Sequence, residues 1–336
     1  MKSICPSILA ILLCATGSFA ANQPPVLQPI GNKTTQAGST LEFAVQAVDG
    51  DGGVLGYDAE IARNLIPLQS HFVPFGMCIN HLSVANQISR CQTRGFTGLS
   101  PNTWDLNTLR AFADHPDVKN GSFKIHSAYW WTSFDVNLDA AALNGLDARL
   151  DVLAGMNASV WLTLDRNGGV TESMLATGAE RIRTISEHCQ AKGVPLVIYP
   201  HGGTLMEDAE EAVAMLQRLN IPSLKIMIHL CHEIMAGNGA RVPEIVADVA
   251  QHLAFASISG STVAVNKSDN WASQIKPLDQ GDYNYVPYIQ ALADVGFTGP
   301  MALHTYNLGD PGATPLPTDH MTRSMRIWRM LVAPTE

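Results

Sequence analysis

The chain has 336 residues, of which 46% are hydrophobic and 15% are charged, and its formal net charge at pH 7 is −9. This composition excludes a disordered, collagen-like or coiled-coil protein, and the length allows two ordinary domains or one large α/β domain with an appendage. The acidic balance disfavours a nucleic-acid partner. No segment after the N-terminal region reaches the roughly 18 apolar residues that a membrane span needs.

The N-terminal residues have the pattern of an export signal. Lys2 precedes an apolar run at 8–13, and the small residues around Ser18 and Ala20 are typical of a signal-peptidase site. We therefore expect residues 1–20 to be a signal peptide and the mature chain to be secreted or periplasmic. The remaining cysteines are too few and too irregularly spaced for a disulfide scaffold, so we expect buried free thiols.

Residues 21–57 have a β signature. Apolar and polar side chains alternate over 41–48, with turns rich in Gly, Asn and Asp on either side. Through PPVLQPIGNKT, AGSTLEF and AVDGDG this segment resembles the opening strands of immunoglobulin-like domains in exported bacterial proteins. A complete sandwich of that type needs roughly 100 residues. We expect a partial β segment over 21–57, either a truncated remnant or a docked ribbon, and then a linker over 58–69.

From residue 70 onwards, short apolar runs alternate with amphipathic helical patterns. The helical patterns have apolar spacings of three and four, as in Val84, Ile88 and Cys91. Eight apolar runs are the expected strands: 72–78, 97–100, 122–131, 159–165, 195–201, 223–232, 254–259 and 300–305. The pattern predicts an α/β fold, a (β/α)8 TIM barrel over residues 70–336, since such barrels need roughly 250 residues. A doubly wound sheet is the alternative, and no GxGxxG turn favours it.

Histidines recur where the expected strands end, which is where such barrels carry their reactive side chains. His201 ends the fifth strand, His229 and His232 end the sixth, and His304 ends the eighth. The two histidines of the sixth strand point the same way only if that strand ends between them. Imidazoles from three strands suit Zn, Mn, Fe or Ni, and they also serve as general acids and bases near pH 7.

We expect His201, His232 and His304 to be catalytic, with His229 next, and the first three are also the candidate metal ligands. Other side chains near the strand ends are candidates for binding substrate: Trp131, Asp165, Tyr199, Trp271 and Lys276.

Several stretches carry a family resemblance. They are GVPLVIYPHGG at 193–203, IHLCHEIMAG at 228–237, the segment 271–306 and SMRIWRML at 324–331. Through them, residues 70–333 resemble the xylose isomerase-like TIM barrels, and within these the subgroup of sugar phosphate isomerases and epimerases. The resemblance implies a small-molecule carbohydrate as the partner and proton transfer beside a carbonyl as the reaction.

The resemblance also implies a divalent metal held by Glu, Asp, His and Glu on strands five to eight. This sequence has Tyr199, His229, Ser257 and His304 at the matching positions. The family's oxygen-rich ligand set is therefore absent.

Three functional alternatives remain. In the first, the histidines bind a softer divalent ion and the enzyme still isomerises or epimerises a sugar. In the second, they act without a metal, together with Asp165 and Lys276, in an epimerase or lyase. In the third, the site only binds carbohydrate, with Trp130, Trp131 and Trp271 as stacking surfaces. Because phosphorylated sugars are mainly cytoplasmic, the predicted export favours an unphosphorylated sugar, keto-sugar or polyol.

Overall fold

The computed structural model describes residues 65–263, 271 and 274–332, and only the backbone of four strands before them. The chain divides into two units, Met1–Asn64 and Leu65–Glu336. In the first unit, strand β1 (Leu9–Ala15) pairs antiparallel with β4 (Leu55–Ile61), and β2 (Val26–Leu27) pairs antiparallel with β3 (Ala47–Val48). The rest of the predicted signal peptide and immunoglobulin-like segment lies outside the described residues.

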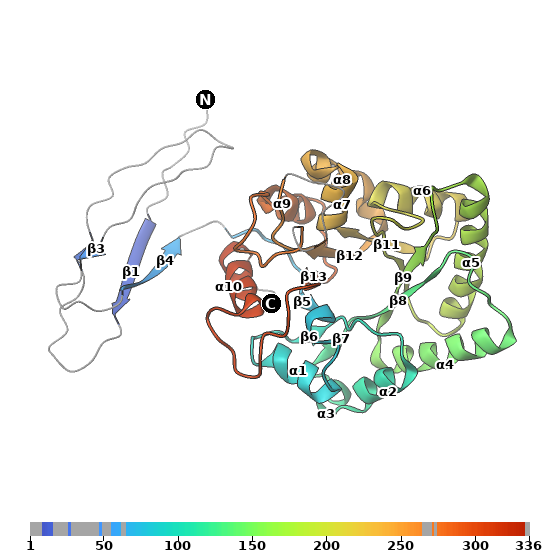
Figure 1. Cartoon of the computed structure of the whole chain (residues 1–336), viewed down its shortest axis with the longest axis horizontal. Coiled ribbons are helices and arrows are strands. Elements are labelled where there is room, and N and C mark those ends of the chain that lie inside the picture. Colours follow the sequence, from blue (N-terminus) through green and yellow to red (C-terminus); the bar gives the residue numbers. More distant parts are fainter. Residues whose placement is uncertain are drawn as a thin grey trace. The chain divides into compact units, whose positions relative to one another are not determined.

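The second unit is built on a curled parallel sheet (Figure 1). Seven strands pair in the order β5-β13-β12-β11-β10-β9-β8. Their bounds are Phe72–Phe75 for β5, Ser127–Ser133 for β8, Ser159–Asp165 for β9, Leu196–Ile198 for β10, Lys225–His229 for β11, Leu253–Ile258 for β12 and Met301–His304 for β13.

Two short strands close the curled sheet into a barrel. Strand β6 (Gly98–Leu99) pairs in parallel with β7 (Lys124–Ile125), which continues into β8 after His126. A single parallel bridge between Phe75 and Ser100 joins β5 to this side. These eight positions coincide with the eight predicted strands, and the predicted TIM barrel is confirmed.

Helices surround the strands on the outside (Figure 1). They are α1 (Val84–Gln92), α2 (Leu106–Asp114), α3 (Pro116–Lys119), α4 (Ala140–Met156), α5 (Glu172–Ala191), α6 (Ala209–Leu219), α7 (Leu230–Ala236), α8 (Val242–Val249), α9 (Val286–Asp294) and α10 (His320–Leu331). Side-chain caps begin several of them: the Thr171 hydroxyl accepts from the Met174 N–H at the start of α5. None of the helices in the described residues is long and apolar enough to span a membrane.

The core has two layers, as expected of parallel strands buried on both faces. One layer packs between the strands and the helices. The other fills the barrel interior with large side chains, in which Trp161 lies edge-on to both Phe75 and Phe255, with ring centroids 5.3 and 5.1 Å away. The described cysteines Cys78, Cys91, Cys189 and Cys231 are free and buried, which confirms that prediction.

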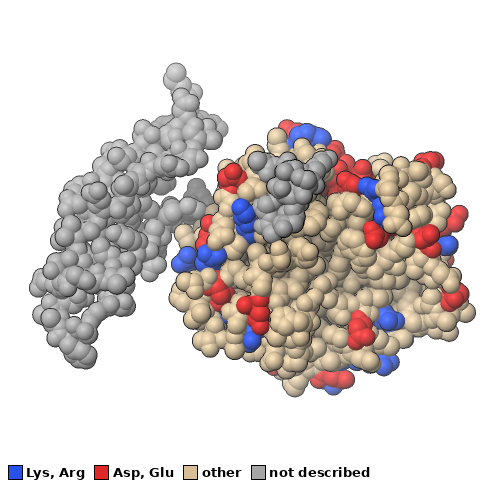
Figure 2. All heavy atoms as spheres, in the orientation of Figure 1, with Lys and Arg blue, Asp and Glu red and all other residues tan. Residues whose placement is uncertain are grey.

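The two ends of the described barrel lie together. The Ile66 N–H donates to the Leu331 carbonyl at 2.8 Å, and Ile66 forms a parallel bridge with Val332. On the face shown in Figure 2, acidic and basic side chains are interspersed among uncharged ones.

Candidate functional site

The carboxyl ends of β10, β11 and β13 bring four histidines together. His229 and His304 are the last residues of their strands, and His201 lies just after β10. Strand β11 ends at His229 and α7 begins at Leu230, so His232 lies in the first helical turn and can share a site with His229. The ring centroids are 4.1 Å apart for His201 and His232, 4.4 Å for His229 and His232, and 4.6 Å for His229 and His304.

A cavity of about 220 Å³ opens at these strand ends. Its lining residues are Phe75, Met77, Tyr129, Trp131, Tyr199, His201, His232, Trp271, Ile275, His304 and Tyr306. All but Met77 and Ile275 carry an aromatic or imidazole ring, and none of the described lining residues is Asp, Glu, Lys or Arg. Trp131 and Tyr306 are each 42% exposed, so they form the rim.

The structure places the predicted substrate-binding residues in two groups. Trp131, Tyr199 and Trp271 line the cavity. Asp165 and Lys276 do not: the Asp165 carboxylate accepts from the Arg166 N–H at 2.8 Å, and the Lys276 backbone pairs with Gly260 through two 2.9 Å hydrogen bonds.

Five lining residues were not among the predicted site residues: Phe75, Met77, Tyr129, Ile275 and Tyr306. Tyr129 lies two residues before Trp131 on β8, so strand alternation places both on one face and could have identified it. Ile275 and Tyr306 lie in loops, where no periodicity marks them.

Hydrogen bonds assign the tautomers of the three histidines in the cavity. A neutral imidazole has one N–H donor and one acceptor nitrogen. The Gly202 N–H donates to His232 Nδ1 at 3.3 Å and the Tyr306 N–H donates to His304 Nδ1 at 3.2 Å, so both rings carry their proton on Nε2. His201 has the opposite arrangement, because its Nδ1 lies 2.8 Å from the Gly202 carbonyl oxygen and donates to it. His201 Nε2 is therefore an acceptor.

All three rings are neutral at pH 7. Burial lowers the pKa of His201 to about 4, against the opposing charges of Asp165 and Glu207, and it lowers the pKa of His304 to about 3. The pKa of His232 is also far below its usual value because of burial and the neighbouring imidazoles. The buried Nε2 of His232 has no hydrogen-bond partner among the described residues, so its N–H is an unsatisfied donor.

His229 is not among the lining residues, and its ring contacts the Tyr199 hydroxyl. Its Nε2 is 2.5 Å from the Tyr199 hydroxyl, and its Nδ1 is 3.3 Å from the Cys231 sulfur. Both ring nitrogens are thus already hydrogen-bonded.

A cluster suited in composition to a soft metal ion is present. His229, Cys231, His232 and His304 offer possible ligand atoms that all lie within 4.8 Å of one another, and zinc binds imidazole nitrogen and thiolate sulfur. A metal-bound imidazole, however, donates a proton from its other nitrogen. His232 and His304 instead accept at Nδ1, and His229 has both nitrogens engaged.

As arranged, these residues do not fit a metal ion. In the predicted ligand set of His201, His232 and His304, only His201 donates from Nδ1 and leaves Nε2 unprotonated, as a metal ligand does. The site is better described as an aromatic cavity with one basic nitrogen and two N–H donors.

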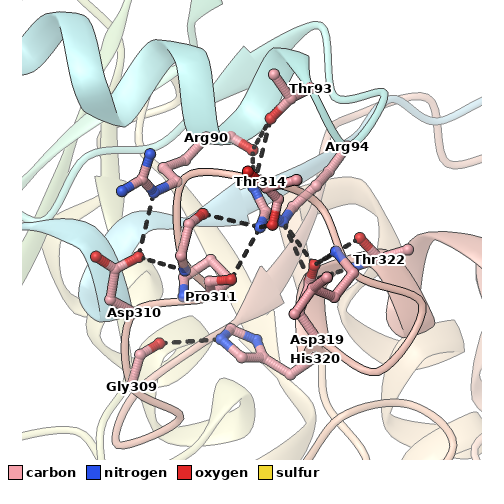
Figure 3. A network of polar contacts seen from close by, with 12 residues as sticks. Arg90, Thr93, Arg94, Gly309, Asp310, Pro311, Thr314, Asp319, His320 and Thr322 are labelled. Carbon is pink, nitrogen blue, oxygen red and sulfur yellow. Dashed lines mark hydrogen bonds and ion pairs between the residues drawn. The ribbon is translucent and has the colours of Figure 1, made fainter.

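One side of the rim is held by a buried ion pair (Figure 3). The segment 305–319 carries Tyr306 and runs to α10. Arg94 Nε lies 3.1 Å from each carboxylate oxygen of Asp319, and its Nη2 donates to the carbonyls of Pro311 and Gly312 at 3.0 Å. The side chains of Arg94 and Asp319 are 0% and 5% exposed.

The profile of the xylose isomerase-like TIM barrel family matches residues 90–327. The chain therefore belongs to this family. No curated protein matches the chain.

Solved structures share the fold at low identity. A D-allulose 3-epimerase from Methylomonas sp. is 15% identical, with 80% of this chain and 100% of that chain covered and a TM-score of 0.61. A 3-keto-D-glucoside 4-epimerase from E. coli is 10% identical, with 78% and 99% covered and a TM-score of 0.57. The IOLI protein, described with a bound zinc atom, is 13% identical, with 77% and 96% covered and a TM-score of 0.60.

Proposed function

We propose that this protein is an isomerase- or epimerase-like enzyme that moves a proton next to a carbonyl of an unphosphorylated sugar or keto-sugar. The names of the similar structures, a D-allulose 3-epimerase and a 3-keto-D-glucoside 4-epimerase, support this reaction class. The observation that carries the proposal is that three residues lining one cavity differ in tautomer: His201 has a basic Nε2, and His232 and His304 each have an Nε2–H donor.

In this proposal each histidine has a distinct role. His201 Nε2 accepts the proton from the carbon beside the carbonyl, as a general base. The Nε2–H groups of His232 and His304 donate hydrogen bonds to the carbonyl oxygen as negative charge develops on it. The surrounding rings exclude water and strengthen these interactions. Trp131, Trp271 and Tyr306 supply flat apolar surfaces for a sugar ring.

The cavity favours a small neutral substrate. Its volume of about 220 Å³ is below the roughly 300–1,000 Å³ of sites for drug-sized ligands, which suits a single sugar ring. A phosphate group would be desolvated among aromatic rings without a cation from the described lining residues, at a large cost in free energy. We propose that the substrate is unphosphorylated and, on the basis of the predicted N-terminal export signal, that the protein is secreted or periplasmic.

Deuterium exchange tests the reaction without knowledge of the final product. The purified chain is incubated in D2O with D-allulose or D-fructose, and loss of the proton beside the carbonyl is followed by ¹H NMR. We expect exchange that His201→Gln lowers about 10²–10⁴-fold, the usual contribution of a general base. His188→Gln is the matched control, because His188 pairs with Asp147 away from the cavity.

Two outcomes would contradict the proposal. Binding of these ketoses without any exchange indicates a carbohydrate-binding barrel that has no catalytic activity. Loss of exchange after treatment with a chelator, with recovery on adding Zn²⁺ or Mn²⁺, indicates that a metal ion carries the chemistry.

A further inference from the structure

Gly202 forms a main-chain hydrogen bond with each of two histidines of the site. Its N–H donates to His232 Nδ1 at 3.3 Å, and its carbonyl oxygen accepts from His201 Nδ1 at 2.8 Å. An amide N–H can only donate and a carbonyl oxygen can only accept, so the direction of both bonds is determined. His201 therefore carries a proton on Nδ1, whereas Nδ1 of His232 carries none and the proton of that ring lies on Nε2. One residue thus gives two neighbouring imidazoles opposite proton positions.

The space beside Gly202 is occupied by the indole ring of Trp271. A Cβ added at residue 202 would lie 3.0 Å from Cη2 and 3.2 Å from Cζ2 of Trp271. Carbon atoms in favourable contact are roughly 3.5–4.0 Å apart, so a side chain here would overlap the ring. Gly202 is not among the glycines with φ in the left-handed region. Space, and not backbone conformation, therefore requires a glycine at this position.

Trp271 also packs on the two imidazoles that Gly202 orients. Its ring centroid lies 5.1 Å from that of His201 and 4.7 Å from that of His232. The Trp271 carbonyl accepts from the N–H groups of Gln274 and Ile275 at 3.1 and 2.9 Å, which anchors its backbone. A displacement of this indole would therefore be transmitted to both histidines.

Hydrogen bonds hold the loop that carries Gly202. The His201 N–H donates to the Met206 carbonyl at 2.9 Å, and the Thr204 hydroxyl donates to the His201 carbonyl at 2.7 Å. Arg166, just after β9, donates from Nε to the Thr204 carbonyl at 2.6 Å. The main-chain groups of Gly202 thus lie on a loop that is fixed to the neighbouring strand end.

We propose that Gly202 is a positioning residue. Its main chain orients His201 as the base and His232 as a donor, and its lack of a side chain allows Trp271 to pack against both rings. This rests on the proposed function for the catalytic roles of the two histidines, but not for their proton positions. A side chain at residue 202 would push the loop and the indole apart, so that the base and the donor are displaced together.

Histidine-selective ¹⁵N labelling of the full chain tests the proton positions without any ligand. We expect His201 in the Nδ1–H form and His232 in the Nε2–H form at pH 7. Gly202→Ala, and more strongly Gly202→Val, should move both rings toward a mixture of forms. His304 should keep its Nε2–H form in these variants, because its Nδ1 accepts from the Tyr306 N–H. The same form for His201 and His232 in the native chain overturns the proposal, and so do native tautomers in both variants.

Deuterium exchange on D-allulose tests the role of the packing. We expect Gly202→Ala to lower the rate constant by up to about 10²-fold, as for a catalytic group displaced by about 1 Å. Trp271→Ala makes room for the added Cβ, so Gly202→Ala should have little further effect in the Trp271→Ala chain. Equal losses from Gly202→Ala in both chains overturn the role of Trp271. Gly169→Ala is the control, since a Cβ there would meet no atom of the described residues within 4 Å.

A chain that exchanges no deuterium with any ketose contradicts the proposed function, and the ¹⁵N tautomers of the native chain and the variants then decide the role of Gly202 on their own.

Discussion

At the scale of single residues, the site depends on which ring nitrogen of each histidine carries a proton. Backbone groups set this for His201, His232 and His304, whereas both ring nitrogens of His229 contact side chains that can either donate or accept. Four imidazoles of the same type thus have different roles, because a neutral ring can be a donor at one nitrogen only.

The rate of deuterium exchange should depend on pH through His201. Burial lowers the pKa of this imidazole to about 4, so its Nε2 is unprotonated throughout the neutral range. We expect a rate constant that is constant from pH 8 to about 5 and falls as the pH approaches 4 and the ring takes up a proton. A rate that already falls by half near pH 6.5 would show that His201 is not the base. Native chain and His201→Gln are compared across the same range.

At the scale of elements, the loop after β13 shows how a rim is made rigid. Residues 305–319 form neither helix nor strand. Arg94, just after α1, holds this loop through hydrogen bonds from its guanidinium to Asp319 and to backbone carbonyls (Figure 3). Asp319 also accepts from the Thr322 N–H and so caps α10. One buried guanidinium therefore links a helix end, a loop and the start of another helix.

Arg94→Ala is expected to lower the free energy of unfolding by about 3–5 kcal/mol, because it leaves a buried carboxylate without its partner. Urea unfolding followed by circular dichroism measures this loss. Lys119→Ala is the control, since Lys119 and Asp114 form an exposed pair, with side chains 60% and 75% accessible, and such pairs contribute about 0–1 kcal/mol. A loss below about 1 kcal/mol for Arg94→Ala would rule out this role for the ion pair.

The strands and the site residues differ in how far the sequence alone predicts them. The eight strands were predictable because each is an apolar run between amphipathic helices, and the histidines were predictable because they follow those runs. The contact of His229 with the Tyr199 hydroxyl was not, since it depends on where β11 gives way to α7. The Asp165 carboxylate and the Lys276 backbone are hydrogen-bonded outside the cavity, and charge alone did not predict this.

At the scale of the whole molecule, buried neutral histidines make stability depend on pH. The pKa values of His126 and His304 are lowered to about 3 by burial, and those of His229 and His232 lie well below the usual value for the same reason. In the unfolded chain these rings take up protons near pH 6.5. Between pH 6.5 and about 3 the unfolded state therefore binds more protons, and stability falls as the pH falls.

Each of these imidazoles contributes at most about 1.4 kcal/mol per pH unit to the slope. We expect the free energy of unfolding in urea to be nearly constant between pH 8 and 7 and to drop steeply from pH 6.5 to 5. His304→Gln should reduce that slope by up to about 1.4 kcal/mol per pH unit, because one buried imidazole no longer contributes. Equal stability at pH 7.5 and 5 would contradict this reasoning.

The contact between Ile66 and the residues Leu331 and Val332 gives the barrel a further property. Adjacent first and last residues of a domain are the condition under which circular permutation is tolerated. The position of these ends is not imposed by the eight strands, so a short linker between them and a new cut in an exposed loop would give a permuted barrel with the same strand order. Because its first and last residues of contact are adjacent, the barrel could also be inserted as a unit into a loop of another protein without separating the two flanking residues of that loop.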